Sequence, residues 1–172
     1  MSILKVARMG HPVLRAKARA IERSDIKTAT VQKLIDDMLD TMAEYHGIGL
    51  AAPQVHEGLR LFVAALGEDG EHDEPYVIIN PEILVVGSDI VEDWEGCLSI
   101  PDVRGRVPRV REIEVRALDR HGERLQLSAH DFAARVIQHE TDHLDGLLFF
   151  DRMDSFESLT FLDEYSRYWT KV

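Results

Sequence analysis

The residues best suited to chemistry in this sequence are two histidines four positions apart, His139 and His143, with Glu140 directly after the first. Four helical residues advance about 400°, so both imidazoles lie on one face, one turn apart, and both can reach the same metal ion. Glu140 lies about 100° round the helix from His139, so it can lean towards a water molecule on the ion without being a ligand. The spacing therefore predicts a metal centre with a carboxylate beside it, and the alternative is a chance pattern.

A two-histidine site needs a further ligand, and Cys97 is the candidate. It is the single cysteine of the chain, which excludes an internal disulfide framework. A lone cysteine is most often a small core residue, but Gly96 and Ser99 are typical of a turn from which a thiolate projects. The other six histidines lie in polar stretches and are better interpreted as solvated: His11, His46, His56, His72, His121 and His130. A thiolate with two imidazoles leaves a fourth position open, which is typical of a catalytic metal.

A third pattern is the segment Gly47–Gln54, in which two glycines and three small residues precede an amide. Glycines allow a backbone to approach a ligand closely, so the segment is a candidate substrate-facing loop that ends in Gln54. It is not a dinucleotide-binding fingerprint, because the third glycine and a preceding strand are missing. A helix end followed by tight packing explains the pattern equally well.

The elements that must position these residues can be predicted from periodicity. Residues 26–46 carry apolar side chains at helical spacing, and Gly47 ends that helix. A second helix is expected to begin near Ser128, with Asp131 completing a loose capping box, to carry both metal-site histidines and to end before Gly146. A third amphipathic stretch covers residues 155–169.

The middle of the chain reads as strands, at residues 59–66, 76–79, 83–91, 113–118 and 124–127, with an acidic loop at 67–75. Strands gathered between helices predict an α+β fold. We expect antiparallel or mixed β-sheets packed around a central helix that carries the histidine pair, with an N-terminal and a C-terminal helix. The 172 residues fit one domain, residues 1–172.

Charge and hydropathy exclude several classes of protein. Lys and Arg number 20 against 31 Asp and Glu, a net charge of −11, which argues against binding DNA, other nucleic acids or anionic membranes in general. No apolar run approaches the ~20 residues of a membrane helix, and the N-terminus lacks the apolar core of a secretion signal. A cytoplasmic protein is expected.

Three motifs together resemble those of the peptide deformylase family: GxGLAAxQ at Gly47–Gln54, EGCLS at Glu95–Ser99 and QHExDHLxG at Gln138–Gly146. All are complete and in the family's order, and the resemblance extends over nearly the whole chain. It implies an enzyme that removes the N-formyl group from the N-terminal formylmethionine of newly made polypeptides and releases formate. It also implies one divalent metal ion per chain, natively Fe²⁺, which Zn²⁺, Ni²⁺ or Co²⁺ can replace. Residue types alone would have indicated zinc.

The resemblance also assigns roles to residues. The metal ligands would be Cys97, His139 and His143, and Glu140 the catalytic carboxylate. The Gln54 amide and the Leu98 N–H would stabilise the oxyanion. The methionine pocket would be formed by Ile48, Leu98, Phe132, Arg135 and Val136, while the Gly49 backbone pairs with the peptide. Arg104 would contact the peptide further along, unless it is simply a solvated arginine.

Two other functions remain open at this level. An HExxH metallopeptidase would cleave internal peptide bonds and normally needs a third His or Glu ligand after the motif. No histidine follows His143, although acids such as Asp145 do. A non-catalytic metal-binding module would need neither Glu140 nor Gln54.

The last expectation concerns the ribosome, where formylated nascent peptides emerge. Related bacterial enzymes are thought to dock there through a basic C-terminal helix, but Asp151–Val172 has five acids against three bases. Its apolar side chains are expected to pack back on the domain: Phe156, Leu159, Phe161, Leu162, Tyr165 and Trp169. We therefore predict a monomer with weak, salt-sensitive ribosome association. Any contact would be made by seven arginines, which are otherwise a solvated strand face: Arg104, Arg106, Arg109, Arg111, Arg116, Arg120 and Arg124.

Overall fold

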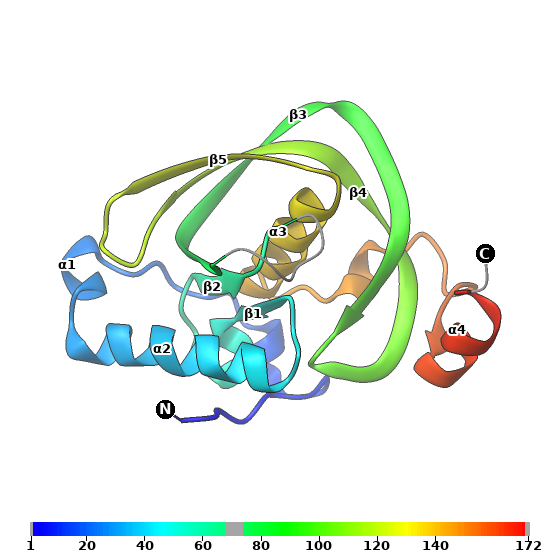
Figure 1. The fold of residues 1–172 in the computed structure, drawn as a ribbon, viewed down its shortest axis with the longest axis horizontal. Helices are drawn as coiled ribbons and strands as arrows, with labels where there is room; N and C mark the ends of the chain where they lie inside the picture. Colours follow the sequence, from blue (N-terminus) through cyan, green and yellow to red (C-terminus); the bar gives the residue numbers. More distant parts are fainter. Residues whose placement is uncertain (1, 68–73, 171–172) are drawn as a thin grey trace.

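The structure is a computed structural model that describes residues 2–67 and 74–170. The acidic loop predicted at 67–75 therefore lies mostly outside the described residues. The elements follow one another in this order: η1 Pro12–Arg15, α1 Arg23–Ile26, α2 Ala29–Glu44, β1 Gly49–Ala51, η2 Ala52–Val55, β2 Leu61–Ala64, β3 Tyr76–Cys97, β4 Ile100–Leu118, β5 Arg124–His130, α3 Asp131–Leu144, η3 Phe149–Arg152, β6 Thr160–Phe161 and α4 Leu162–Tyr168 (Figure 1).

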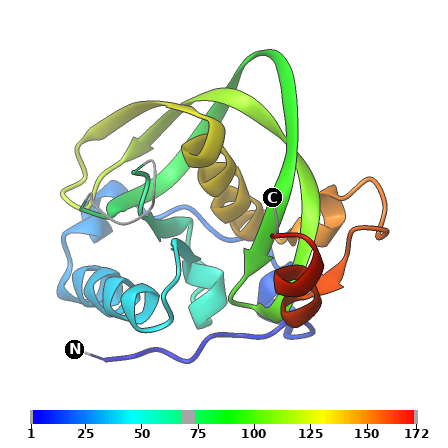
Figure 2. The same cartoon turned by 45° about the vertical axis from the view of Figure 1, so that its right-hand side comes forward.

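The strands form an antiparallel sheet in the order β1-β2-β3-β4-β5, with β6 paired to β4. The long strands β3 and β4 curve, and α3 lies on the concave side of the sheet (Figures 1 and 2). This arrangement confirms the predicted α+β fold, with one helix inside and helices near both ends.

The helix α3 is central because most of its surface is apolar or partnered. Its Ala134, Ile137 and Leu144 are buried against Phe62 and Ile113 of the sheet. The helix α2 covers another part of the sheet through a separate buried cluster that includes Ile35, Met38, Leu61 and Val63. Burying such side chains stabilises the fold by about 1.5–3 kcal/mol each.

The sheet is longer than the sequence predicts. The strand β3 is continuous where two strands were expected, and β4 begins at Ile100, well before residue 113. The pairing of β3 with β4 shifts register between Ile79 and Glu82 and between Val86 and Ile90. Each irregularity breaks the alternation of inward and outward side chains, so the period-2 signal is lost although the pairing continues.

The predicted boundaries of the helices also change. The helix predicted at residues 26–46 is shorter at both ends, because α2 begins after Thr28 and ends at Glu44. The Thr28 side chain accepts a hydrogen bond from the Val31 N–H, and the single turn α1 is a separate element before it. The predicted start of the second helix near Ser128 is wrong. Ser128 pairs with Glu114 in the sheet and β5 continues to His130, so α3 begins at Asp131.

The C-terminal segment differs most from expectation. Only Leu162–Tyr168 is helical, and it follows the short strand β6. Phe156 and Phe161 are 65% and 68% exposed, so the prediction that they pack back on the domain is wrong. Within the described residues, no helix combines the length and the apolar character needed to span a membrane.

Candidate active site

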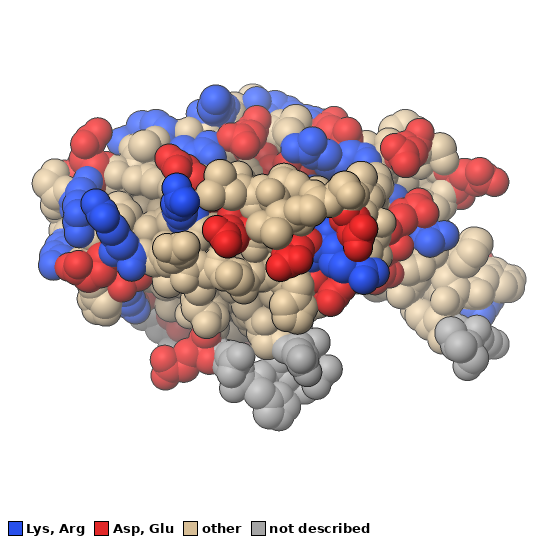
Figure 3. All heavy atoms as spheres, turned by 90° about the horizontal axis from the view of Figure 1, so that it is seen from above, with Lys and Arg blue, Asp and Glu red and all other residues tan. Residues whose placement is uncertain are grey.

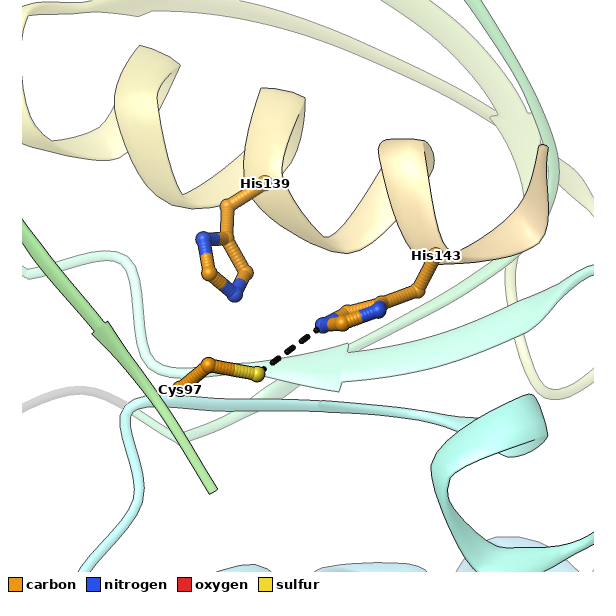
Figure 4. Close-up of side chains that lie close together, drawn as sticks. All are labelled: Cys97, His139 and His143. Atoms are coloured by element: carbon orange, nitrogen blue, oxygen red, sulfur yellow. Dashed lines mark hydrogen bonds between the residues drawn. The ribbon is translucent and has the colours of Figure 1, made fainter. Parts of the chain in front are cut away.

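The three predicted metal ligands meet at one point. His139 and His143 lie one turn apart on α3, and Cys97 ends β3, opposite them (Figure 4). The Cys97 Sγ lies 3.3 Å from the His143 Nε2. One potential ligand atom from each of the three residues lies within 4.8 Å of those from the others. Ligand atoms on one tetrahedral ion are about 3.5 Å apart, so the group fits a single metal ion.

A hydrogen bond fixes the orientation of His139. Its Nδ1 lies 2.8 Å from the Glu95 Oε2, so the N–H at that position donates to the carboxylate. The lone pair is then on Nε2, which points towards Cys97 and His143 (Figure 4). Carboxylate partners of this kind set the tautomer of metal-binding histidines and increase their basicity. For His143, burial lowers the pKa well below its usual value, which keeps that imidazole neutral and able to bind a metal.

Glu95 belongs to a buried network of charges. Arg109 donates to both of its oxygens, at 2.8 and 3.0 Å, and also to Asp142. Arg135 donates to Glu95 at 2.9 Å. Burial by itself would raise the pKa of Glu95, but hydrogen bonds from His139 and Arg109 outweigh it and hold the pKa well below its usual range. The carboxylate therefore stays ionised behind His139.

Arg109 was expected on a solvated face, and this is wrong. Its side chain is only 4% exposed and joins two buried carboxylates, one at the end of β3 and one on α3. An arginine that bridges two inward-facing acids satisfies both with charge-assisted hydrogen bonds. Its charge suggested solvent, although it lies on the same face of β4 as the buried Val107 and Ile113.

Replacing Arg109 should destabilise the protein strongly. Arg109→Met leaves Glu95 and Asp142 without their shared cation, and removing one partner of a buried ion pair costs about 3–5 kcal/mol of the free energy of unfolding. The matched control is Arg111→Met on the same strand, because Arg111 pairs with Asp131 at the surface and exposed pairs contribute about 0–1 kcal/mol. Urea denaturation measures both variants, and equal losses would contradict the structural role given to Arg109.

Glu140 is buried beside the metal-ligand group and is free to take a proton. Its Oε2 has no hydrogen-bond partner among the described residues, and it lines the same cleft as Cys97 and His139. Burial raises the pKa of Glu140 to about 7. Such a value suits a group that both accepts and releases a proton near neutral pH.

Gly49 makes the position of Glu140 possible. A Cβ atom at Gly49 would lie 2.3 Å from the Glu140 Oε1, far inside contact distance. Gly49→Ala should therefore displace the carboxylate and lower turnover by at least ~10-fold while the protein stays folded, since misplacing a catalytic group by about 1 Å can cost 10²-fold. The control is Gly58→Ala, where an added Cβ meets no atom of residues 2–67 and 74–170 within 4 Å. Normal turnover in Gly49→Ala would show that the carboxylate tolerates the displacement.

Gln54 is held by its neighbours so that its amide points to the same place. Its Oε1 accepts a hydrogen bond from the Ala51 N–H at 2.8 Å. Its Nε2 lies 3.2 Å from the Ser99 Oγ and 3.5 Å from the Cys97 Sγ. A donor fixed beside the predicted metal ligands is placed to stabilise negative charge that develops there.

An open cleft of about 590 Å³ lies over these residues. All the residues expected to contact substrate line it: Ile48, Gly49, Leu98, Arg104, Phe132, Arg135 and Val136. Arg135 differs from expectation in one respect. Its guanidinium is bonded to Glu95 and to the Val91 and Val107 carbonyl oxygens, so it holds β3 and β4 as well as lining the cleft.

Comparison with known proteins identifies this arrangement. The family model described as polypeptide deformylase matches residues 3–158. The chain belongs to the peptide deformylase family. It is 44% identical to Peptide deformylase 2 of Nostoc sp. over 98% of this chain and 96% of that protein. It is 45% identical to Peptide deformylase 1 of Clostridium acetobutylicum over 89% and 96% of the two chains.

Solved structures agree with the sequence comparison. The peptide deformylase of Thermotoga maritima is 36% identical and superposes with a TM-score of 0.82, covering 90% of this chain and all of that one. The peptide deformylase of Synechococcus elongatus, in complex with actinonin, is 39% identical with a TM-score of 0.82, covering 95% and 85%.

The chain is thus an enzyme of the peptide deformylase family, a hydrolase that removes the N-formyl group from the N-terminal formylmethionine of newly made polypeptides. The metallopeptidase and the non-catalytic module are set aside. Sequence reasoning gave Glu95 no role, although an acid two positions before Cys97 within a shared motif was a usable signal. It also missed the contribution of Trp94 and Leu162 to the cleft.

Proposed function

We propose that this deformylase works with one divalent metal ion per chain, held by the Cys97 thiolate and by the His139 and His143 imidazoles. The observation that carries the proposal is the convergence of these three ligand atoms, with His139 fixed by Glu95 so that its Nε2 is free. The proposed native ion is Fe²⁺, which Zn²⁺, Ni²⁺ or Co²⁺ can replace. A set of one soft sulfur and two nitrogens accepts all four.

A bound divalent ion supplies Lewis-acid chemistry, because it makes a water molecule acidic near neutral pH and polarises a carbonyl oxygen. Glu140 accepts the proton of the attacking water at its free carboxylate oxygen, then delivers it to the departing amine of the peptide. The Gln54 Nε2–H and the Leu98 backbone N–H donate to the oxygen on which negative charge develops. The products are formate and a peptide with a free N-terminal methionine.

Apolar side chains of the cleft are proposed to hold the methionine. Ile48, Leu98, Phe132 and Val136 line the cleft next to the metal-ligand residues. Phe132 and Ile48 are partly exposed, at 37% and 42%, so they offer apolar surface that a bound side chain can cover. The Gly49 backbone is proposed to pair with the peptide, and Arg104 to contact it further along.

The test of the proposed function is formate release from a formyl-methionyl peptide by protein purified without oxygen, with metal analysis of the same sample. We expect turnover in proportion to bound metal. Turnover that is undiminished after the metal is removed would contradict the proposed metal centre.

Ribosome association is proposed to be weak. On the face seen in Figure 3, basic side chains are interspersed with acidic ones. Of the seven arginines proposed for contact, Arg109 is buried, and three others face acids: Arg106 with Glu92, Arg111 with Asp131 and Arg120 with Asp36. Each such pair reduces the positive charge available to RNA phosphates.

Removal of residues 156–172 should therefore change ribosome affinity little. It should harm stability more, because Tyr165 and Trp169 pack on Trp94, with ring centroids 4.9 and 5.5 Å apart. Co-sedimentation with ribosomes at physiological salt, beside thermal unfolding of both proteins, measures the two effects. Tight binding that is lost on removal of the tail, in a protein that stays folded and active, would contradict the proposal.

The proposed location is the cytoplasm, because the substrate is a newly made polypeptide that the enzyme meets where translation occurs.

The proposed oligomeric state is a monomer, since one chain supplies the candidate ligands, the carboxylate and the cleft. Sedimentation equilibrium of the active protein tests this, and activity that appears only with a dimer would contradict it.

A further inference from the structure

The C-terminal segment reaches the substrate cleft. The strand β6 pairs with β4 so that Thr160 lies opposite Arg104 and Phe161 opposite Val103. The next residue, Leu162, lines the same cleft as His139 and Glu140. The polypeptide deformylase family model ends at residue 158, so this part of the wall comes from outside the matched region.

Aromatic packing holds the segment in place. Trp94 of β3 lines the cleft, and its ring contacts those of Tyr165 and Trp169, with centroids 4.9 and 5.5 Å apart. The helix α4 accordingly lies beside β3 and β4 at the edge of the molecule (Figures 1 and 2). Leu162 is thus fixed from both sides, by β6 before it and by the aromatic contacts of α4 after it.

Adjacent residues of the segment point in opposite directions. Phe161 is 68% exposed and does not line the cleft, whereas Leu162 is half-buried and does. Leu162 and Trp94 together give this part of the cleft an apolar wall. Charged side chains also line the cleft, among them Arg8, Asp102 and Arg104.

The edge of the sheet offers a place for the peptide backbone. Among the described residues, the strand β1 is an edge strand that pairs with β2 alone, so its Gly49 backbone can accept an extended peptide as a further strand. Side chains of an extended peptide alternate between its two sides. If the formylmethionine side chain enters the cleft, as the proposed function requires, the side chain of the third residue is the next to face the same side.

We infer that Leu162 and Trp94 form a subsite for the third residue of the formylated peptide, and that this subsite favours an apolar side chain. The inference rests on the proposed function and adds a specificity determinant supplied by the C-terminal segment. Leu162 acts by contact with the substrate side chain and takes no part in the proton transfers.

The experiment compares amidated formyl-Met-Ser-Leu with formyl-Met-Ser-Asn, whose third side chains are similar in size and differ in polarity. For the unmodified enzyme, we expect kcat/KM about tenfold higher with leucine, the size of effect that one apolar contact gives. Leu162→Asn should reduce this ratio to near one, and Leu162→Met should keep it. Phe161→Asn, the matched control on the adjacent exposed residue, should leave the ratio unchanged.

A two-residue substrate, amidated formyl-Met-Ser, separates this role from a structural one. Its kcat/KM should be the same in all four proteins, because it has no third residue. The inference is overturned if the unmodified enzyme does not discriminate between leucine and asparagine, if Leu162→Asn lowers kcat/KM equally for all three substrates, or if Leu162→Asn keeps the leucine preference of the unmodified enzyme. Equal formate release from all substrates would overturn the subsite and leave the proposed function intact. No formate release from any substrate would overturn both the subsite and the proposed function.

Discussion

Glu140→Gln should retain about one metal ion per chain and lose turnover by at least ~10²-fold, the low end for general acid–base catalysis. The amide has the shape of the carboxylate but cannot accept the proton of the attacking water. The loss should be limited to turnover, because Glu140 lines the cleft and its Oε2 has no hydrogen-bond partner among the described residues. No hydrogen bond to that oxygen is lost in the variant, so stability should change little.

The measurement is formate release beside metal content after dialysis. Glu57→Gln, a change at an exposed glutamate, is the control and should behave as the unmodified enzyme. Loss of the metal ion from Glu140→Gln would make Glu140 a ligand and overturn the role given to it.

Cys97→Ser is the second substitution from which we expect a large loss, in this case of bound metal and of formate release. A hydroxyl is a far poorer metal ligand than a thiolate, so we expect metal affinity to fall by more than about 100-fold, since changes outside the ligand set already cost 10–100-fold. Formate release should fall with it. The Sγ lies 3.3 Å from the His143 Nε2 and 3.5 Å from the Gln54 Nε2, so the substitution acts at the meeting point of the site.

Dialysis of Cys97→Ser and Glu140→Gln side by side gives an internal comparison, because only the first should lose its metal. Circular dichroism checks that both remain folded. Unchanged metal content and turnover in Cys97→Ser would remove Cys97 from the ligand set.

Much of the site could be predicted from the sequence because its geometry is local. His139, Glu140 and His143 lie within two turns of one helix, so helical periodicity alone places the imidazoles on one face and the carboxylate beside them. Three motifs in order then indicated the family, which the comparisons confirmed. The α+β class also followed from sequence, since the apolar spacing of α2 and the strand-rich middle are local patterns.

Other features depended on contacts between distant residues. Cys97 is 46 positions from His143, and only the curved path of β3 around α3 brings them together. Arg109 looked solvated because it is charged and is one of seven arginines in this stretch of sequence, and it proved to join two buried acids that come from β3 and α3.

The sequence by itself determined the helix that carries the histidines, the family and the class of fold, because these depend on spacing within a few turns of chain. Tertiary structure alone decided how His139 is oriented, since the Glu95 carboxylate that fixes it comes from another element. It also decided that Leu162 enters the cleft, through the pairing of β6 with β4 and the packing of α4 on Trp94. Long-range pairing of this kind leaves little trace in local periodicity, because the pattern of a strand shows which side chains share a face but not which distant segment that face or edge will meet.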